Sequence, residues 1–320
     1  MPVRVIGMIG VEPPKGTTLH VIGGGVSAPF LKEFAQAHEA AGFDMVLVGY
    51  YSSSAEGFNV ASYAAAHTRT LAYLIAHRPG IVSPTLAARA AATFDHLSGG
   101  RLALHIIAGV SDQEQESEGD FLKKDARYDR AAEYLGIVRK MWTMDKPFDH
   151  EGPYYKFRGA WSAVKPLQKP YPPVFFGGSS AGALSMGAEH CDVFALFGEP
   201  LKETAERIDE FRQRAGAFGR VPRFNISFRP IIAATEGQAW DKAHKALQEL
   251  EGANFSRGAQ DKSAERMRAI AARGDTHDEQ LCCRSPRRPA PRAIRPAWWA
   301  RRGRWPTPCS STTGWVSARS

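Results

Sequence analysis

The sequence is poor in cysteine and contains no long apolar segment. Four cysteines occur among 320 residues, and their spacing matches neither a disulfide framework nor a set of metal ligands. No run of about 18 apolar residues is present, and the N-terminus lacks a basic segment followed by an apolar one. We therefore expect a soluble, cytoplasmic protein with no membrane span and no metal centre, whose chemistry does not depend on cysteine.

Acidic residues are absent from the last forty positions, which hold nine arginines and no lysine. The formal net charge of the whole chain is +8, so the first 280 residues together carry a charge of −1. A protein that binds a nucleic-acid backbone needs a basic face on its folded part. The location of the charge therefore argues against nucleic acid as a partner.

Short apolar runs alternate with helical patterns along the first 251 residues, an alternation typical of a parallel sheet covered by helices. The expected strands cover residues 3–10, 44–49, 71–76, 101–107, 174–176, 192–196 and 223–230. The expected helices cover residues 29–42, 59–68, 84–97, 128–144, 181–190, 200–218 and 236–251. Polar and glycine residues follow nearly every strand, which favours a closed (β/α)8 barrel of the TIM type over an open sheet. Residues 145–173 form an irregular insertion, and an eighth unit is required for closure.

The segment 281–320 differs in composition from the rest of the chain. It contains four of the seven tryptophans and six prolines without any periodicity, whereas disordered tails are poor in tryptophan. A second interpretation is a frameshift between Glu279 and Pro291. Tryptophan has a single codon, so reading from the third base turns Trp298-Trp299-Ala300 into Val-Gly, and one choice of the degenerate codons gives a helix followed by a strand. We predict a barrel domain over residues 1–280 that has lost its eighth unit and exposes two sheet edges, followed by an aberrant tail.

A loop of glycine and serine follows the fifth expected strand. Gly177-Gly178-Ser179-Ser180 lies between that strand and a helical pattern. Backbone N–H groups at a helix N-terminus, two hydroxyls and the missing side chains of the glycines suit a phosphate group. An ordinary strand-to-helix turn has the same composition. The loop alone leaves both interpretations open.

Several motifs together resemble the bacterial-luciferase-like flavin monooxygenases, and among them the FMNH2-dependent alkanesulfonate monooxygenases. The motifs are AHRPG at 76–80, SPT at 83–85, AARAAATFDHLSGGR at 87–101, RYD at 127–129, QKPYPP at 168–173, FGGSS at 176–180 and FGEP at 197–200. The resemblance spans residues 3–280. It implies a TIM-type barrel with insertions, a homodimer or homotetramer, and FMN that a separate NAD(P)H-dependent FMN reductase supplies as FMNH2.

The resemblance also implies the chemistry and the residues that bind the cofactor. FMNH2 reacts with O2 to a C4a-peroxyflavin that oxygenates a small organosulfur substrate, and an alkanesulfonate would release sulfite and an aldehyde. The implied cofactor-binding residues are His77, Arg78, Gly109, Ser111, Tyr128, Gly178, Ser179 and Ser180.

Four positions of the implied substrate site depart from the family pattern. The family has Arg and His two residues apart on strand seven, where this chain has Ser227 and Arg229. Ser54 replaces a cysteine after strand two, and Phe197 replaces a tryptophan after strand six. Arg229 could supply a cation for a sulfonate, or it could pair with a helix carboxylate. We take Arg229, Ser227 and Ser54 as the candidate catalytic residues.

Three other functions are compatible with the same sequence. One is hydride transfer with the deazaflavin F420 on the same fold. Another is a non-catalytic frameshift product. The third is a metal-dependent barrel hydrolase, but the histidines at positions 77, 96 and 105 lie on different elements without the spacing of metal ligands. Dependence on oxygen and release of sulfite would distinguish the monooxygenase from the F420 enzyme.

Overall fold

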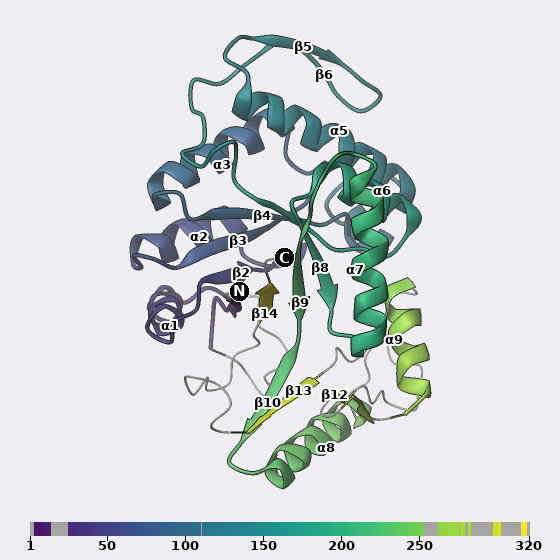
Figure 1. Cartoon of the computed structure of the whole chain (residues 1–320). Helices are drawn as coiled ribbons and strands as arrows, with labels where there is room; N and C mark the ends of the chain where they lie inside the picture. Colours follow the sequence, from purple (N-terminus) through teal and green to yellow (C-terminus); the bar gives the residue numbers. More distant parts are fainter. Residues whose placement is uncertain are drawn as a thin grey trace.

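The computed structural model describes residues 3–13, 25–109, 111–252, 262–274, 276–278, 281–282, 297–301 and 315–318. Within these residues a closed barrel has the strand order β1-β14-β9-β8-β7-β4-β3-β2 (Figure 1). Its strands are β1 (Arg4–Ile9), β2 (Met45–Val48), β3 (Ala72–His77), β4 (Leu102–Ile106), β7 (Val174–Phe176), β8 (Val193–Phe197), β9 (Arg223–Ser227) and β14 (Trp315–Ala318). All neighbouring strands from β1 through β2, β3, β4, β7 and β8 to β9 are parallel, which confirms the TIM-type architecture.

Helices follow the parallel strands and cover the outside of the barrel, except for α8, which lies against β10 and β13 (Figure 1). They are α1 (Ala28–Ala40), α2 (Gly57–Ala66), α3 (Pro84–Ser98), α4 (Asp112–Glu116), α5 (Lys124–Thr143), α6 (Ala181–His190), α7 (Leu201–Gly216), α8 (Glu236–Gly252) and α9 (Lys262–Ala272). The expected signals mark their ends: Pro84 opens α3, and Gly99 closes it in the left-handed conformation with φ of 70°. None of the described helices is both long enough and apolar enough to cross a membrane.

The core has two layers, because successive side chains of a strand point to opposite faces. One cluster fills the barrel interior and includes Ile6, Leu47, Leu74, Ala103 and Phe175. The larger cluster lies between the outer face of the barrel and the helices, and includes the intervening residues of the same strands. On β3, this alternation directs Leu74 and Ala76 into the barrel and Tyr73, Ile75 and His77 toward the helices.

Two smaller sheets lie outside the barrel. The insertion between α5 and β7 carries a hairpin of β5 (Phe148–Glu151) and β6 (Lys156–Ala160). The second sheet has the order β10-β13-β12-β11, formed by β10 (Arg229–Ala233), β13 (Ala297–Arg301), β12 (Leu281–Cys282) and β11 (Thr276–His277). The strand expected over residues 223–230 is therefore divided: the chain leaves the barrel at Phe228 and joins the second sheet.

The barrel is closed by the segment that the sequence marks as aberrant. Strand β14 pairs antiparallel with β1, where Arg4 faces Ser317, and antiparallel with β9, where Ser227 faces Trp315. The expectation of two exposed sheet edges is therefore wrong, because backbone groups of both edges find partners in β14. A (β/α)8 barrel has a parallel eighth strand. In the described residues the eighth position instead holds a strand that runs the opposite way.

Candidate functional site

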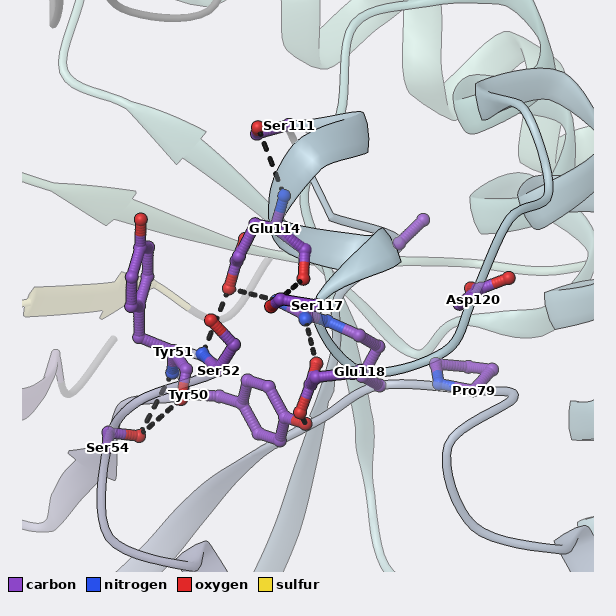
Figure 2. Close-up of polar contacts among 12 residues, drawn as sticks. Tyr50, Tyr51, Ser52, Ser54, Pro79, Ser111, Glu114, Ser117, Glu118 and Asp120 are labelled. Atoms are coloured by element: carbon purple, nitrogen blue, oxygen red, sulfur yellow. Dashed lines mark hydrogen bonds and ion pairs between the residues drawn. The ribbon is translucent and has the colours of Figure 1, made fainter. Parts of the chain in front are cut away.

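One buried arginine joins the ends of β2 and β3 to α4. Arg78 follows β3, is 3% exposed, and donates to Glu114 Oε1 at 2.8 Å and to Glu118. Its guanidinium carbon lies 4.4 Å from the ring centroid of Tyr50, whose hydroxyl also donates to Glu118. The backbone N–H of Ser52 donates to Glu114 at 3.1 Å. Figure 2 shows Tyr50, Ser52, Glu114 and Glu118 converging between the end of β2 and α4.

This cluster changes the role expected of Arg78. Both terminal nitrogens of its guanidinium already donate to carboxylates of the α4 region, so the side chain holds that helix against the barrel mouth. Burial, followed by the contact with Glu118, raises the pKa of Tyr50 well above its usual value, and the phenol therefore remains a donor at neutral pH. Ser54 lies in the turn after β2, where its hydroxyl donates to the carbonyl of Tyr51 at 2.8 Å.

Helix α5 fixes the loops after β3 and β4 through two further buried arginines. Arg127 is 2% exposed, and its Nε donates to the carbonyl of Ala108 at 2.8 Å while Nη1 donates to Asp112 at 2.8 Å. Arg130 donates to both carboxylate oxygens of Asp120 and to the carbonyl of Pro79 at 3.1 Å. These contacts place the loops after β3 and β4 on one scaffold.

Gly80 makes room for this scaffold. Its φ of +104° is in a region that disfavours residues with a side chain, and a β-carbon there would collide with the guanidinium of Arg130. The motif AHRPG therefore needs a glycine at position 80, because the guanidinium of Arg130 occupies the space of a side chain there.

His77, expected beside the cofactor, faces the helical layer instead of the barrel interior. Its Nε2 lies 2.7 Å from the hydroxyl of Tyr134 on α5. The two side chains border a small cavity between strands and helices, lined also by Phe58, Ala87, Leu104, Ile106, Leu135 and Val138. Burial lowers the pKa of His77 to about 4, so the imidazole is neutral at physiological pH. At the barrel mouth the residue contributes its backbone and not its ring.

The end of β4 carries a glycine and a helix cap. Gly109 has φ of +76°, and a β-carbon there would collide with the amide of Gln115, which is 0% exposed. Ser111 caps α4, with its hydroxyl accepting from the backbone N–H of Glu114 at 3.3 Å. Gln115 therefore packs directly beneath the glycine that the resemblance assigns to the cofactor site.

The end of β7 carries the loop of glycine and serine. Ser180 caps α6, and its hydroxyl accepts from the backbone N–H of Ala183 at 3.3 Å. A β-carbon on Gly178 would lie 2.7 Å from the Ala183 side chain and 2.9 Å from Phe176, so this position accepts no larger residue. Ser179 lies between Gly178 and Ser180 in this loop. The loop thus ends at a helix N-terminus whose positive end suits an anion.

Tyr128 connects the ends of β4 and β7. On α5 it lies edge-on to Phe176, with ring centroids 6.2 Å apart, and a β-carbon on Gly182 in the first turn of α6 would be 3.7 Å from its ring. The neighbouring Arg127 contacts the loop after β4. The structure therefore places six of the expected cofactor residues at or beside the ends of the neighbouring strands β4 and β7: Gly109, Ser111, Tyr128, Gly178, Ser179 and Ser180.

Two expected catalytic residues, Ser227 and Arg229, lie in different sheets. Ser227 ends β9 in the barrel and is 1% exposed, and its backbone carbonyl accepts from the backbone N–H of Gly198 at 2.9 Å. Arg229 begins β10 in the second sheet. The intervening Phe228 occupies the space that a side chain on Gly198 would need. The strand alternation expected to direct Ser227 and Arg229 the same way is interrupted there.

Several site residues were not identified from the sequence. The carboxylates of Glu114, Glu118 and Asp120 and the guanidinium of Arg130 form the scaffold described above, and Arg207 on α7 donates to the carbonyl of Gly178 at 3.2 Å. Charged residues on amphipathic elements are usually exposed, so no pattern distinguished these. Across the described residues, no group of three or more His, Cys, Asp or Glu is arranged to hold a metal ion.

Comparisons with known proteins give a consistent result. A family model described as luciferase-like monooxygenase matches residues 12–288. Riboflavin lyase (RcaE), solved with modified FMN and riboflavin, matches with a TM-score of 0.65 and 24% identity over 69% of this chain and 60% of that chain. EDTA monooxygenase (EmoA) from Chelativorans sp. BNC1 matches with a TM-score of 0.62 and 20% identity, over 76% of this chain and 62% of that chain.

A third similar structure uses another cofactor. The coenzyme F420-dependent tetrahydromethanopterin reductase from Methanopyrus kandleri matches with a TM-score of 0.63 and 16% identity, over 77% of this chain and 74% of that chain. The present chain spans only about three fifths of the length of RcaE and EmoA. At these identities the solved structures establish the shared fold.

Proposed function

The chain belongs to the luciferase-like monooxygenase family, and we propose that it is the oxygenase of a two-component system that uses FMNH2 and O2. The observation that supports this most directly is the convergence of two capped helix N-termini, two crowded glycines and Tyr128 at the ends of β4 and β7. A phosphorylated flavin needs one anion site at the barrel mouth, and we propose that this arrangement is that site.

The residues present fit an FMN molecule. Gly178 has no space for a β-carbon, so the backbone can approach a phosphate closely, and the hydroxyls of Ser179 and Ser180 lie in the same loop. We propose that Gly109, Ser111 and Tyr128 complete the phosphate subsite. The bound flavin would supply the redox chemistry with O2. The chain itself would orient the cofactor through the arginine-anchored loops at the barrel mouth and limit the access of water there.

For the substrate we propose a small organosulfur compound, with alkanesulfonate desulfonation to sulfite and aldehyde as the type reaction. A sulfonate requires a cation at the site. Arg78 is already paired with Glu114 and Glu118. We therefore propose Arg229, at the start of β10, as the cation, and Ser227 and Ser54 as further polar groups of the substrate site. A neutral sulfone has no such requirement. A screen should therefore pair each sulfonate with a sulfone of the same carbon skeleton.

The test has a binding step and a turnover step. Anaerobic titration of the 320-residue chain with FMNH2, followed by intrinsic fluorescence, should give saturable binding. Addition of O2, an NAD(P)H-dependent FMN reductase and substrate should then give oxygenated product, with sulfite from sulfonates. Saturable binding followed by no product from either substrate series would contradict the organosulfur assignment and leave the flavin assignment intact.

A second candidate is F420-dependent hydride transfer, favoured by the fold shared with the F420-dependent reductase. Reduced FMN and reduced F420 can be compared directly in the same binding assay. Tighter binding of F420 and product formation without O2 would favour this alternative over the monooxygenase.

We further propose that the segment 281–320 is read out of frame and that the in-frame protein is a cytoplasmic homodimer or homotetramer. The antiparallel direction of β14 supports this, because a strand–helix repeat would continue with a parallel strand. Sequencing the gene tests the proposal. Stop codons, or no helix-and-strand pattern, in the alternative frame after residue 279 would contradict it. Sedimentation of both versions would report the oligomeric state.

A further inference from the structure

Arg207 on α7 is a half-buried arginine at the loop of glycine and serine. Its Nη2 donates to the carbonyl of Gly178 at 3.2 Å, and its guanidinium carbon lies 5.9 Å from the ring centroid of Phe194. Within the described part of the chain it forms no ion pair with a carboxylate. It is thus a positive charge partly removed from water without a negative partner in contact.

The two acids whose charges act on Arg207, Glu199 and Glu210, each contact another arginine. Glu199, which follows β8, accepts from Arg266 Nε through both carboxylate oxygens at 2.8 Å. Glu210 pairs with Arg214 at 3.1 Å. Burial, the largest cause, lowers the pKa of Arg207, Arg266 lowers it further, and the charges of Glu199 and Glu210 offset this only in part. An anion arriving at the loop would give Arg207 a negative partner in contact.

Arg101, elsewhere in the barrel, differs from Arg207 in the number of its hydrogen-bond partners. Arg101 also lacks a carboxylate in contact, but its guanidinium donates to four oxygens, those of Ser98, Thr68, Leu71 and Ala65. That side chain is satisfied by the protein alone. Arg207 donates to one carbonyl only, so most of its five N–H donors remain for solvent or a ligand.

We propose that Arg207 is the cationic residue of the phosphate subsite. By holding the carbonyl of Gly178 on one side of the loop, it leaves the N–H groups of the loop directed toward the ligand, and its charge stabilises the phosphate dianion. This rests on the proposed function, since it takes a phosphorylated flavin as the ligand. It adds a specific consequence: Arg207 makes the chain prefer FMN to riboflavin, which has the same ring system without the phosphate.

The experiment compares the dissociation constants of FMN and riboflavin in four forms of the full chain: wild type, Arg207→Met, Arg207→Lys and Arg214→Met. Arg214 lies on the same helix, is exposed, and pairs with Glu210, so it is a matched control. In Arg207→Met the affinity for FMN should fall about tenfold or more, which corresponds to one lost charge–charge contact. The affinity for riboflavin should change less than about twofold, Arg207→Lys should retain part of the preference, and Arg214→Met should match wild type.

Inorganic phosphate probes the subsite without the flavin. It should raise the thermal midpoint of the wild type and of Arg214→Met, but not that of Arg207→Met. Equal losses of FMN and riboflavin affinity in Arg207→Met, or an unchanged ratio, would overturn the proposal while the proposed function stands. A wild type that responds to phosphate and binds no flavin would overturn the proposed function and support the anion subsite. No response of the wild type to phosphate or flavin would overturn both.

Discussion

The arginines on the two sides of the barrel mouth, the side of β3 and β4 and the side of β7 and β8, have different partners. On the side of β3 and β4, Arg127 and Arg130 each contact a carboxylate, that of Asp112 or Asp120, as Arg78 does at α4. On the side of β7 and β8, Arg207 contacts a single carbonyl. On the first side each of these three charges contacts a carboxylate without any ligand, whereas Arg207 gains a charged partner when an anion binds.

This difference separates scaffold from ligand site. Removing one member of a buried ion pair leaves an uncompensated charge and costs about 3–5 kcal/mol. Removing an arginine that has no charged partner costs much less in the free protein and shows its effect when the anion is bound. The side of β3 and β4 should therefore govern stability, and the side of β7 and β8 should govern affinity.

The largest effect is expected from Asp120→Ala, which leaves the guanidinium of Arg130 buried without its carboxylate. The free energy of unfolding in urea should fall by about 3–5 kcal/mol. Asp209→Ala, which removes the exposed partner of Arg212, should change it by less than about 1 kcal/mol. Similar losses in the two variants would show that the scaffold does not depend on its buried pairs.

The second effect is a dependence of the unfolding free energy on pH through His77. This residue lies on β3, on the same side of the barrel, and contacts Tyr134. Burial lowers the pKa of His77 to about 4 in the folded protein, against 6.5 for an exposed histidine. Below pH 6.5 the unfolded chain binds a proton that the folded chain does not, so stability is complete above pH 6.5 and falls as the pH approaches 4. The loss over this range should be about 3 kcal/mol.

The variant His77→Gln isolates this contribution from other titrating groups. The difference in unfolding free energy between wild type and His77→Gln should shrink steadily as the pH is lowered from 7 to 4.5. A difference that stays constant with pH would show that His77 binds its proton equally well in both states.

A smaller effect is expected from Gly80→Ala, which both strains the backbone and meets the guanidinium of Arg130. We expect a loss of about 2–3 kcal/mol in unfolding free energy. Gly99→Ala is the matched control, because Gly99 also has a positive φ, of 70°, but a β-carbon there meets nothing within 4 Å. It should lose about 1–2 kcal/mol from strain alone. Equal losses would mean that the arginine moves aside without cost.

The barrel could be predicted from the sequence because its signals are local. Short apolar runs, Pro84 at a helix start and Gly99 at its end mark the elements within a few residues. The seven parallel strands follow from such marks together with the family resemblance, and the cofactor site at the ends of β4 and β7 stays a prediction from that resemblance. Strand β14 could not be predicted, because its pairing joins residues more than 300 positions apart, such as Arg4 and Ser317.

The carboxylates that pair with the buried arginines could not be predicted from the sequence either. Arg78 binds carboxylates 36 and 40 positions away, and nothing in the local pattern separates these from exposed acids on a helix. His77 was assigned to the cofactor from a motif. The alternation of Tyr73, Ile75 and His77 places it on one face of β3, but the sequence alone does not say which face lines the barrel.

The most direct test of the distinction between the two sides is the ratio of FMN to riboflavin affinity, measured in parallel in Arg130→Met and Arg207→Met. We predict that Arg130→Met is less stable but keeps the ratio of the wild type in its folded molecules, while Arg207→Met keeps its stability and loses about tenfold in the ratio. A normal ratio in Arg207→Met together with a reduced ratio in Arg130→Met would contradict the assignment of scaffold and ligand site to the two sides.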